Sequence, residues 1–142
     1  MIDFLNYPKF TYDEMKCQCG CGRANMDLVF MDTLSAIRWG CGFPFPVNSG
    51  FRCKRWDDLI GGAGVHPKGK GIDIQIYGPR AWMVFELAFK KGSGVTGIGI
   101  KQDGPWGGRL IHMDSMPGSK EHPRPRVWTY PTWINVGTVK LI

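Results

Sequence analysis

The stretch Ile72-Asp73-Ile74-Gln75-Ile76 alternates apolar and polar residues with a period of two. This alternation predicts a half-buried β-strand, because successive side chains of a strand point to opposite faces of a sheet. Further strands are predicted over residues 95–100 and 109–113, with a short strand-like segment over 46–49. Asp73 needs a partner on such an apolar strand, since an unpaired buried charge is very costly. The stretch therefore predicts both a sheet and a polar site on it.

Two helices are predicted beside these strands. The first begins at Asn25 or Asp27, either of which can cap it, and runs to about Trp39 with apolar residues at near-helical spacing. The second begins at Pro79, a residue suited to the first helical turn, and runs to Lys91. We therefore expect the α+β class, with a small antiparallel sheet and flanking helices.

The chain has 142 residues, and no repeat or low-complexity linker divides it. We expect a single domain over residues 1–142, monomeric, with an irregular tail rich in Pro and aromatic residues from about residue 117. A chain of this length can bury a core without disulfide or metal staples. Apolar residues make up 43% and charged residues 21%, which is the balance of a globular and not of a disordered protein.

Charge and the first residues restrict the class of function. The formal net charge of +6 favours an anionic partner, but the basic residues are scattered, so we expect no nucleic-acid partner. No stretch approaches the roughly 18 uninterrupted apolar residues of a membrane helix, so no membrane span is expected. Residues 1–10 lack the features of a secretory signal. We expect the chain to be made in the cytoplasm and to act elsewhere only after release.

Three of the five cysteines alternate in Cys17-Gln18-Cys19-Gly20-Cys21. Alternate residues of an extended segment point to one side, so these thiolates could converge on a soft metal and form a second, structural zinc site. The other interpretation, slightly favoured because no second clean Cys/His pair is present, is that they are small buried apolar residues beside tight glycine turns. Cys41 and Cys53 complete a ligand set only if the fold brings them close. The odd number argues against a full disulfide framework.

The chain has three histidines, so each can be considered separately. His66 and Asp73 are separated by six residues, and His112 lies in the later apolar strand. Two imidazoles and a carboxylate facing one point could bind zinc and leave a fourth position for water, as catalytic zinc sites do. The alternative interpretation takes each residue alone. His66 is then a loop histidine, Asp73 a carboxylate at a strand edge, and His112 a core histidine whose hydrogen bonds are satisfied. His122 lies in the Pro/Arg-rich tail and is interpreted as a surface residue.

Several segments resemble, in their order along the chain, the M15-type zinc peptidases. They are Ser49-Gly50-Phe51-Arg52-Cys53, Gly61-Gly62-Ala63, His66-x-x-Gly69-x-Gly71-x-Asp73 and His112-Met113-Asp114. That family includes D-Ala-D-Ala carboxypeptidases and phage endolysins, and it is related to the lysostaphin and hedgehog folds. Residues 10–22 also resemble the opening of its M15A-like phage and prophage branch. The resemblance covers roughly residues 10–115, and the combination is specific although each motif alone is weak.

The resemblance implies a role for each matching residue. His66, Asp73 and His112 would be the zinc ligands. Arg52, grouped with Ser49 as substrate-binding, would steady the substrate carbonyl or carboxylate, a role that suits its fixed fork of donors; otherwise it forms a structural ion pair, for which Asp114 is a candidate partner.

Asp114 would be the general base, an outer-shell group that orients a ligand, or the partner of Arg52. Many relatives place the base three residues before the last ligand, where this chain has Arg109, which cannot act as a base at neutral pH. Asp103 is the reserve candidate. Two further departures are Gly64, where relatives carry Ser, and Trp56-Asp57, where they commonly carry His-Asn.

The function implied by the resemblance is a zinc-dependent peptidase that hydrolyses peptidoglycan stem peptides. It would be an endolysin-like endopeptidase or a D,D- or L,D-carboxypeptidase. It would act on the cell wall, in the periplasm or wall of the host. One alternative is a non-catalytic, zinc-stabilised module that binds peptide or cell wall, which the basic residue Arg109 favours. Another is a nucleic-acid-binding zinc protein built on the cysteines, but it leaves Asp73 and His112 unexplained.

Overall fold

The computed structural model describes residues 2–130. The α-helices are α1 (Tyr12–Met15), α2 (Leu28–Cys41), α3 (Lys54–Leu59) and α4 (Gly78–Ala88). The strands are β1 (Val47–Ser49), β2 (Gly71–Ile74), β3 (Gly97–Lys101), β4 (Leu110–Asp114) and β5 (Arg126–Thr129). Three short 3₁₀ helices complete the set: η1 (Phe4–Asn6), η2 (His66–Lys68) and η3 (Trp106–Gly108).

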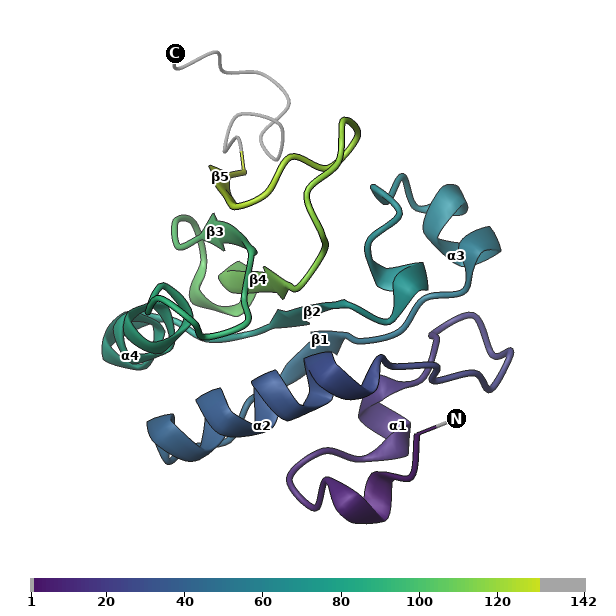
Figure 1. Cartoon of the computed structure of the whole chain (residues 1–142), viewed down its shortest axis with the longest axis horizontal. Coiled ribbons are helices and arrows are strands. Elements are labelled where there is room, and N and C mark those ends of the chain that lie inside the picture. Colours follow the sequence, from purple (N-terminus) through teal and green to yellow (C-terminus); the bar gives the residue numbers. More distant parts are fainter. Residues whose placement is uncertain (1, 131–142) are drawn as a thin grey trace.

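The strands form one sheet in the order β1-β2-β4-β3-β5 (Figure 1). All neighbouring pairs are antiparallel except β3 and β5, which run parallel. The prediction of an α+β fold with a small sheet and flanking helices is confirmed. The sheet is mixed and not purely antiparallel, because residues 115–125 connect β4 to the far side of β3 and bring β5 back in the direction of β3.

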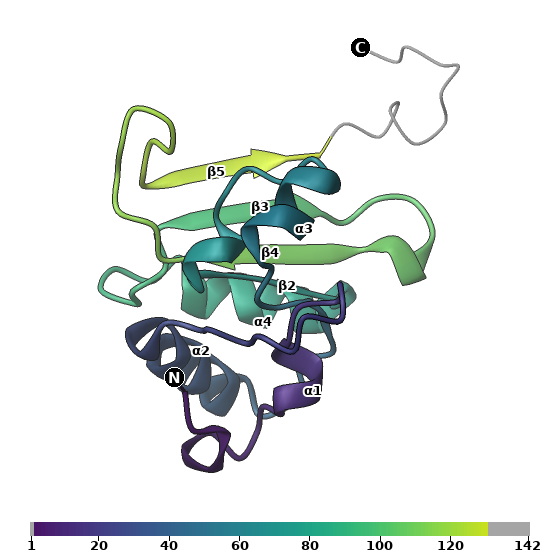
Figure 2. The same ribbon diagram turned by 90° about the vertical axis from the view of Figure 1, so that its right-hand side faces the viewer.

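The two faces of the sheet differ in character. On one face Ile72, Ile74, Ile111 and Met113 are completely buried and belong to the same apolar cluster as the inner residues of α2 and α4. α4 lies on one side of the sheet and α3 on the other (Figures 1 and 2). The period of two therefore directs the alternate residues of β2 and β4, which include Asp73, toward the side of α3 and η2.

The two predicted helices are present, but α2 extends past Trp39 to Cys41 and α4 is shorter than predicted. Asp27 caps α2, because its side chain accepts a hydrogen bond from the Phe30 N–H at 3.0 Å. α4 contains Pro79 in its first turn, as predicted, but it ends at Ala88 and not at Lys91. The Ala88 carbonyl accepts a hydrogen bond from Ser93 Oγ at 2.7 Å, which replaces the helical hydrogen bond that a further turn would supply.

The tail differs from the expectation of an irregular segment, because β5 forms there. The hydrogen bonds of β5 come from its pairing with β3. Because β5 has only four residues and most of them are exposed, the sequence shows no periodic pattern that would predict this strand. Residues 131–142 of the expected tail lie outside the described residues. The short helices α1 and α3 were also not predicted from the sequence. None of the helices in the described part of the chain has the length and apolar character needed to cross a membrane.

Candidate functional site

One row of residues crosses the sheet at the same level on all strands. The register pairs Ser49 with Asp73, Asp73 with His112, His112 with Gly99, and Gly99 with Trp128. Directly paired residues point to the same face of a sheet. Gly99 leaves the room that Trp128 occupies, since a Cβ there would lie 2.7 Å from the indole Nε1. The Trp128 ring consequently lies 5.3 Å from the His112 ring, centroid to centroid.

His66 reaches this row from η2. It is buried, and its Nδ1 lies 2.7 Å from the Gly50 carbonyl oxygen. A carbonyl oxygen only accepts hydrogen bonds, so Nδ1 carries the proton and donates it. The other ring nitrogen, Nε2, faces Asp73 Oδ2 at 3.4 Å. The carbonyl therefore sets the tautomer in which His66 can bind a metal through Nε2.

His112 lies between two carboxylates. Its Nδ1 is 2.9 Å from Asp73 Oδ1, and its Nε2 is 2.9 Å from Asp114 Oδ2. Burial disfavours the charged ring, but the hydrogen bonds and charges of Asp114 and Asp73 outweigh burial and raise the pKa of His112. The same contacts work in the opposite direction on Asp73: burial acts to raise its pKa, whereas His112 and His66 lower it well below the usual range.

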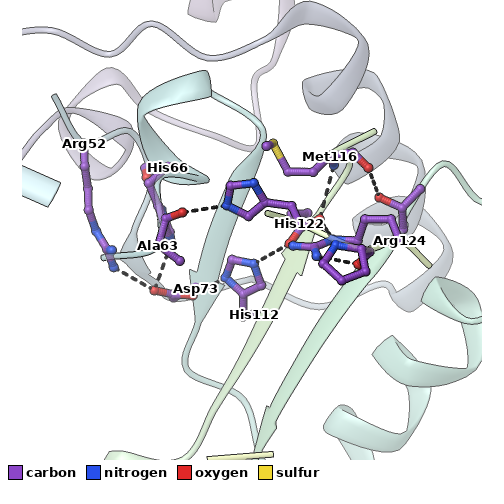
Figure 3. Close-up of polar contacts among 12 residues, drawn as sticks. Arg52, Ala63, His66, Asp73, His112, Met116, His122 and Arg124 are labelled. Atoms are coloured by element: carbon purple, nitrogen blue, oxygen red, sulfur yellow. Dashed lines mark hydrogen bonds and ion pairs between the residues drawn. The ribbon is translucent and has the colours of Figure 1, made fainter. Parts of the chain in front are cut away.

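The donor set of His66, Asp73 and His112 fits a zinc ion. One ligand atom of each residue lies within 4.8 Å of those of the other two (Figure 3). Two imidazole nitrogens and one carboxylate oxygen are donors that catalytic zinc accepts. Both histidines also have an outer partner on the second ring nitrogen, Gly50 for His66 and Asp114 for His112, which is the arrangement that orients metal-binding histidines.

Asp114 is completely buried beneath His112. Besides His112 it accepts two hydrogen bonds from Arg124, Nε to Oδ1 at 2.9 Å and Nη2 to Oδ2 at 2.8 Å. The Met116 N–H donates to it at 3.2 Å. Both carboxylate oxygens are thus occupied, and the partner of Asp114 is Arg124 and not Arg52.

Arg52 extends along the other side of Asp73 (Figure 3). Its Nη2 donates to Asp73 Oδ2 at 3.0 Å, its Nη1 to Asp57 Oδ1 at 3.1 Å, and its Nε to Ser49 Oγ at 2.8 Å. The Asp57 side chain is only 1% exposed and also accepts from the Gly64 N–H. Ser49 and Asp57 therefore hold the guanidinium in place beside Asp73.

A cleft of about 670 Å³ lies over this group. The cleft is lined by Arg52, His66, Asp73 and His112 together with residues of the loop between α3 and η2 and of the C-terminal segment. The C-terminal residues are Glu121, His122, Arg124, Arg126, Trp128 and Tyr130. Ser49, Asp103 and Asp114 are not among the described residues that line it. Asp103 pairs with Lys101 at 3.3 Å in the loop before β4. A groove of about 730 Å³ beside α2 has no histidine, cysteine or carboxylate in its described lining.

Four residues that the structure brings to the site had no role predicted from the sequence: Asp57, Glu121, Arg124 and Trp128. In the sequence, Asp57 differs from the residue that M15-type peptidases commonly carry at this position, and it has no predicted role there. Arg124 and Trp128 belong to the tail that was expected to be irregular. His122, interpreted as a surface residue, is half-buried, and its Nε2 lies 2.6 Å from the Ala63 carbonyl oxygen at the cleft. No local pattern marks Arg124, Trp128 or His122, because their partners Asp114, His112 and Ala63 are distant in sequence.

Four of the five cysteines are also gathered in one place. One sulfur atom each from Cys17, Cys19, Cys21 and Cys53 lies within 4.8 Å of the others. Cys41, at the end of α2, does not belong to this group. The fold thus decides which of the two later cysteines joins the alternating three.

A comparison with protein families supports the metal-centre interpretation. The family described as Peptidase M15 matches residues 8–114, a segment that contains the His/Asp/His group, Arg52 and all five cysteines. No match was found among the curated proteins or among the solved structures.

Proposed function

The chain belongs to the peptidase M15 family, a family of zinc-dependent metallopeptidases, and on that premise we propose that it hydrolyses peptide bonds of peptidoglycan stem peptides. The observation that carries the proposal is the group of His66, Asp73 and His112, whose donor atoms converge at a cleft of peptide-binding size. Zinc bound by these residues supplies Lewis acidity, which polarises a peptide carbonyl and activates water for attack. The remaining chemistry belongs to the side chains around it.

Arg52 is the group that we assign to the substrate. It lines the cleft, and the hydrogen bonds to Asp57 and Ser49 fix its orientation without a substrate present. A preorganised guanidinium stabilises developing negative charge on a carbonyl oxygen, or it grips a terminal carboxylate. Ser49 acts through Arg52, since its hydroxyl accepts from the Arg52 Nε. The first role suits an endopeptidase, and the second suits a carboxypeptidase.

The general base, which accepts the proton of the attacking water, is assigned from the positions of the carboxylates relative to the cleft. Asp114 is buried and has both oxygens occupied, so we assign it the positioning role: it keeps the proton on His112 Nε2 and leaves Nδ1 for the metal. Of the described carboxylates, Asp73 and Glu121 line the cleft, and Asp73 belongs to the ligand set. Glu121 is exposed and is therefore our candidate for accepting the proton of the attacking water.

The surroundings of the cleft suit an anionic peptide. Arg52 and Arg126 line it beside the aromatic rings of Trp128 and Tyr130. Stem peptides carry carboxylates, which these cations attract, and the net charge of +6 favours approach to an anionic wall polymer. We propose that the protein acts on this wall polymer.

The test is digestion of purified peptidoglycan, followed by mass spectrometry of the new peptide termini. We expect termini that are absent after chelation, return with added zinc, and are absent with the His66→Ala variant. Asp58→Asn is the matched control, because Asp58 is exposed on α3 and pairs only with Lys54 among its described contacts. A chain that binds zinc at His66, Asp73 and His112 but cuts no wall type would instead be the non-catalytic binding module.

A further inference from the structure

The geometry of the four gathered cysteines matches a tetrahedral metal site. Cys19 Sγ and Cys53 Sγ lie 3.7 Å apart. Four sulfurs around zinc at about 2.3 Å are separated by roughly 3.8 Å along the edges of the tetrahedron. A disulfide requires about 2.05 Å, so this pair is not bonded. All four sulfur atoms fall within 4.8 Å of one another, close to this tetrahedron.

The surroundings of the sulfurs suit bound thiolates. The Cys53 N–H donates to Cys17 Sγ at 3.3 Å, a contact that a thiolate ligand accepts. The positively charged Arg23 side chain lies near Cys21, Cys19 and Cys53. Its positive charge offsets part of the negative charge of four thiolates. Cys17 and Cys53 are 1% and 2% exposed, whereas Cys19 is half-buried and Cys21 is exposed, so the group lies between the core and the surface.

We propose that Cys17, Cys19, Cys21 and Cys53 form a structural zinc site, separate from the His/Asp/His centre. Four protein ligands fill the tetrahedral coordination of zinc and leave no position for water or substrate, which is the property of structural sites. Thiolates select soft metals such as zinc over calcium or magnesium.

This site connects the loop of residues 17–21 to residues 48–53, the segment that contains Arg52 and the Gly50 carbonyl. Cys53 directly follows Arg52, and three residues before it the Gly50 carbonyl accepts the hydrogen bond from His66. The loop also contacts this segment through Gln18 Nε2, which donates to the Asn48 carbonyl at 2.7 Å. Closing the four thiolates on one ion therefore fixes the backbone that orients His66 and Arg52.

The first test measures metal in the full-length protein purified without added zinc. We expect two zinc ions per chain. A His66→Ala/His112→Ala double variant should retain one, and X-ray absorption of this retained zinc should show sulfur ligands at about 2.3 Å. Because this readout requires no peptidase activity, it distinguishes failure of the thiolate site from failure of the proposed function.

The second test uses matched cysteine variants. Cys19→Ser should lose one zinc ion and retain the other, whereas Cys41→Ser should retain both, because Cys41 is a buried cysteine outside the group. Should Cys19→Ser fail to fold, cobalt substitution of the His66→Ala/His112→Ala chain gives the same answer through intense sulfur-to-cobalt charge-transfer absorption. The proposal is overturned if the wild-type chain holds one zinc ion and the His66→Ala/His112→Ala chain holds none, if the cysteines bind iron in place of zinc, or if a disulfide joins two of the four cysteines.

Discussion

Asp114 and Glu121 have opposite surroundings, and this difference assigns them different roles. Asp114 is fully buried and binds His112 and Arg124, whereas Glu121 is exposed at the cleft. We expect Asp114→Asn to weaken zinc binding at the His/Asp/His centre by about 10- to 100-fold, the usual cost of losing an outer partner of a metal-bound histidine. Competition with a zinc chelator measures this change.

The Glu121→Gln variant provides the contrast. It should leave zinc affinity unchanged and lower kcat by about 10²- to 10⁴-fold, as the loss of a general base does. The reverse pattern, with zinc affinity intact and kcat lost in Asp114→Asn, would make Asp114 the base.

The raised pKa of His112 predicts a pH dependence of the metal-free chain. Burial disfavours the charged ring, but Asp114 and Asp73 outweigh it, so the pKa in the folded chain exceeds the ordinary value of 6.5. The charged ring therefore stabilises the metal-free fold fully below pH about 6.5. This contribution is lost as the pH rises through the higher pKa of the folded state. Thermal unfolding of chelated protein over a pH series measures it.

The same proton competes with zinc, because His112 Nδ1 must lose it to bind the metal. Zinc affinity of the His/Asp/His centre should thus fall as the pH falls through the raised pKa. An affinity that does not change with pH would show that His112 is neutral in the metal-free chain.

At the scale of elements, Gly69 at the end of η2, the helix that begins with His66, lies against the start of α2. The Asp27 N–H donates to the Gly69 carbonyl at 3.0 Å, and Gly69 has a positive φ of +70°. A Cβ at this position would overlap the backbone of Asn25. Gly69→Ala should therefore lower the free energy of unfolding by more than the roughly 1–2 kcal/mol that a left-handed conformation costs, and it should also displace His66.

Gly42→Ala is the matched control for this change. Gly42 has a φ of +75°, but nothing lies within 4 Å of a Cβ there. Gly42→Ala should lower the free energy of unfolding only by the roughly 1–2 kcal/mol that the left-handed backbone conformation costs. Urea unfolding measures this change. Equal decreases in the free energy of unfolding of the two variants would mean that the contact between η2 and α2 accommodates the added Cβ with no loss of stability.

At the scale of the whole molecule, the net charge of +6 predicts how salt affects activity. Screening shortens the Debye length from about 10 Å at 0.1 M to about 3 Å at 1 M salt. Hydrolysis of intact peptidoglycan should fall several-fold over this range, because attraction to an anionic polymer is screened. A soluble stem peptide is the control substrate and should be affected much less. Equal salt dependence for both substrates would place the effect in the cleft itself.

Much of the local structure was predictable from the sequence. The alternation over residues 72–76 predicted β2, and the capping residue Asp27 with apolar residues at helical spacing predicted α2. Period and capping depend on residues close together in the chain, so a local pattern contains the required information. The motif around His66, Asp73 and His112 also singled out the residues that the fold brings together.

Long-range pairing was decided only by the tertiary structure. The parallel addition of β5 to β3 brings Arg124 to Asp114 and Trp128 to His112, and neither contact follows from a local pattern. The fold likewise selects Cys53 and not Cys41 as the companion of the alternating cysteines. The sequence by itself determined which side chains carry metal-binding chemistry, because that depends on residue type and spacing. Their partners depend on which distant segments pack side by side, and only the folded chain settles that.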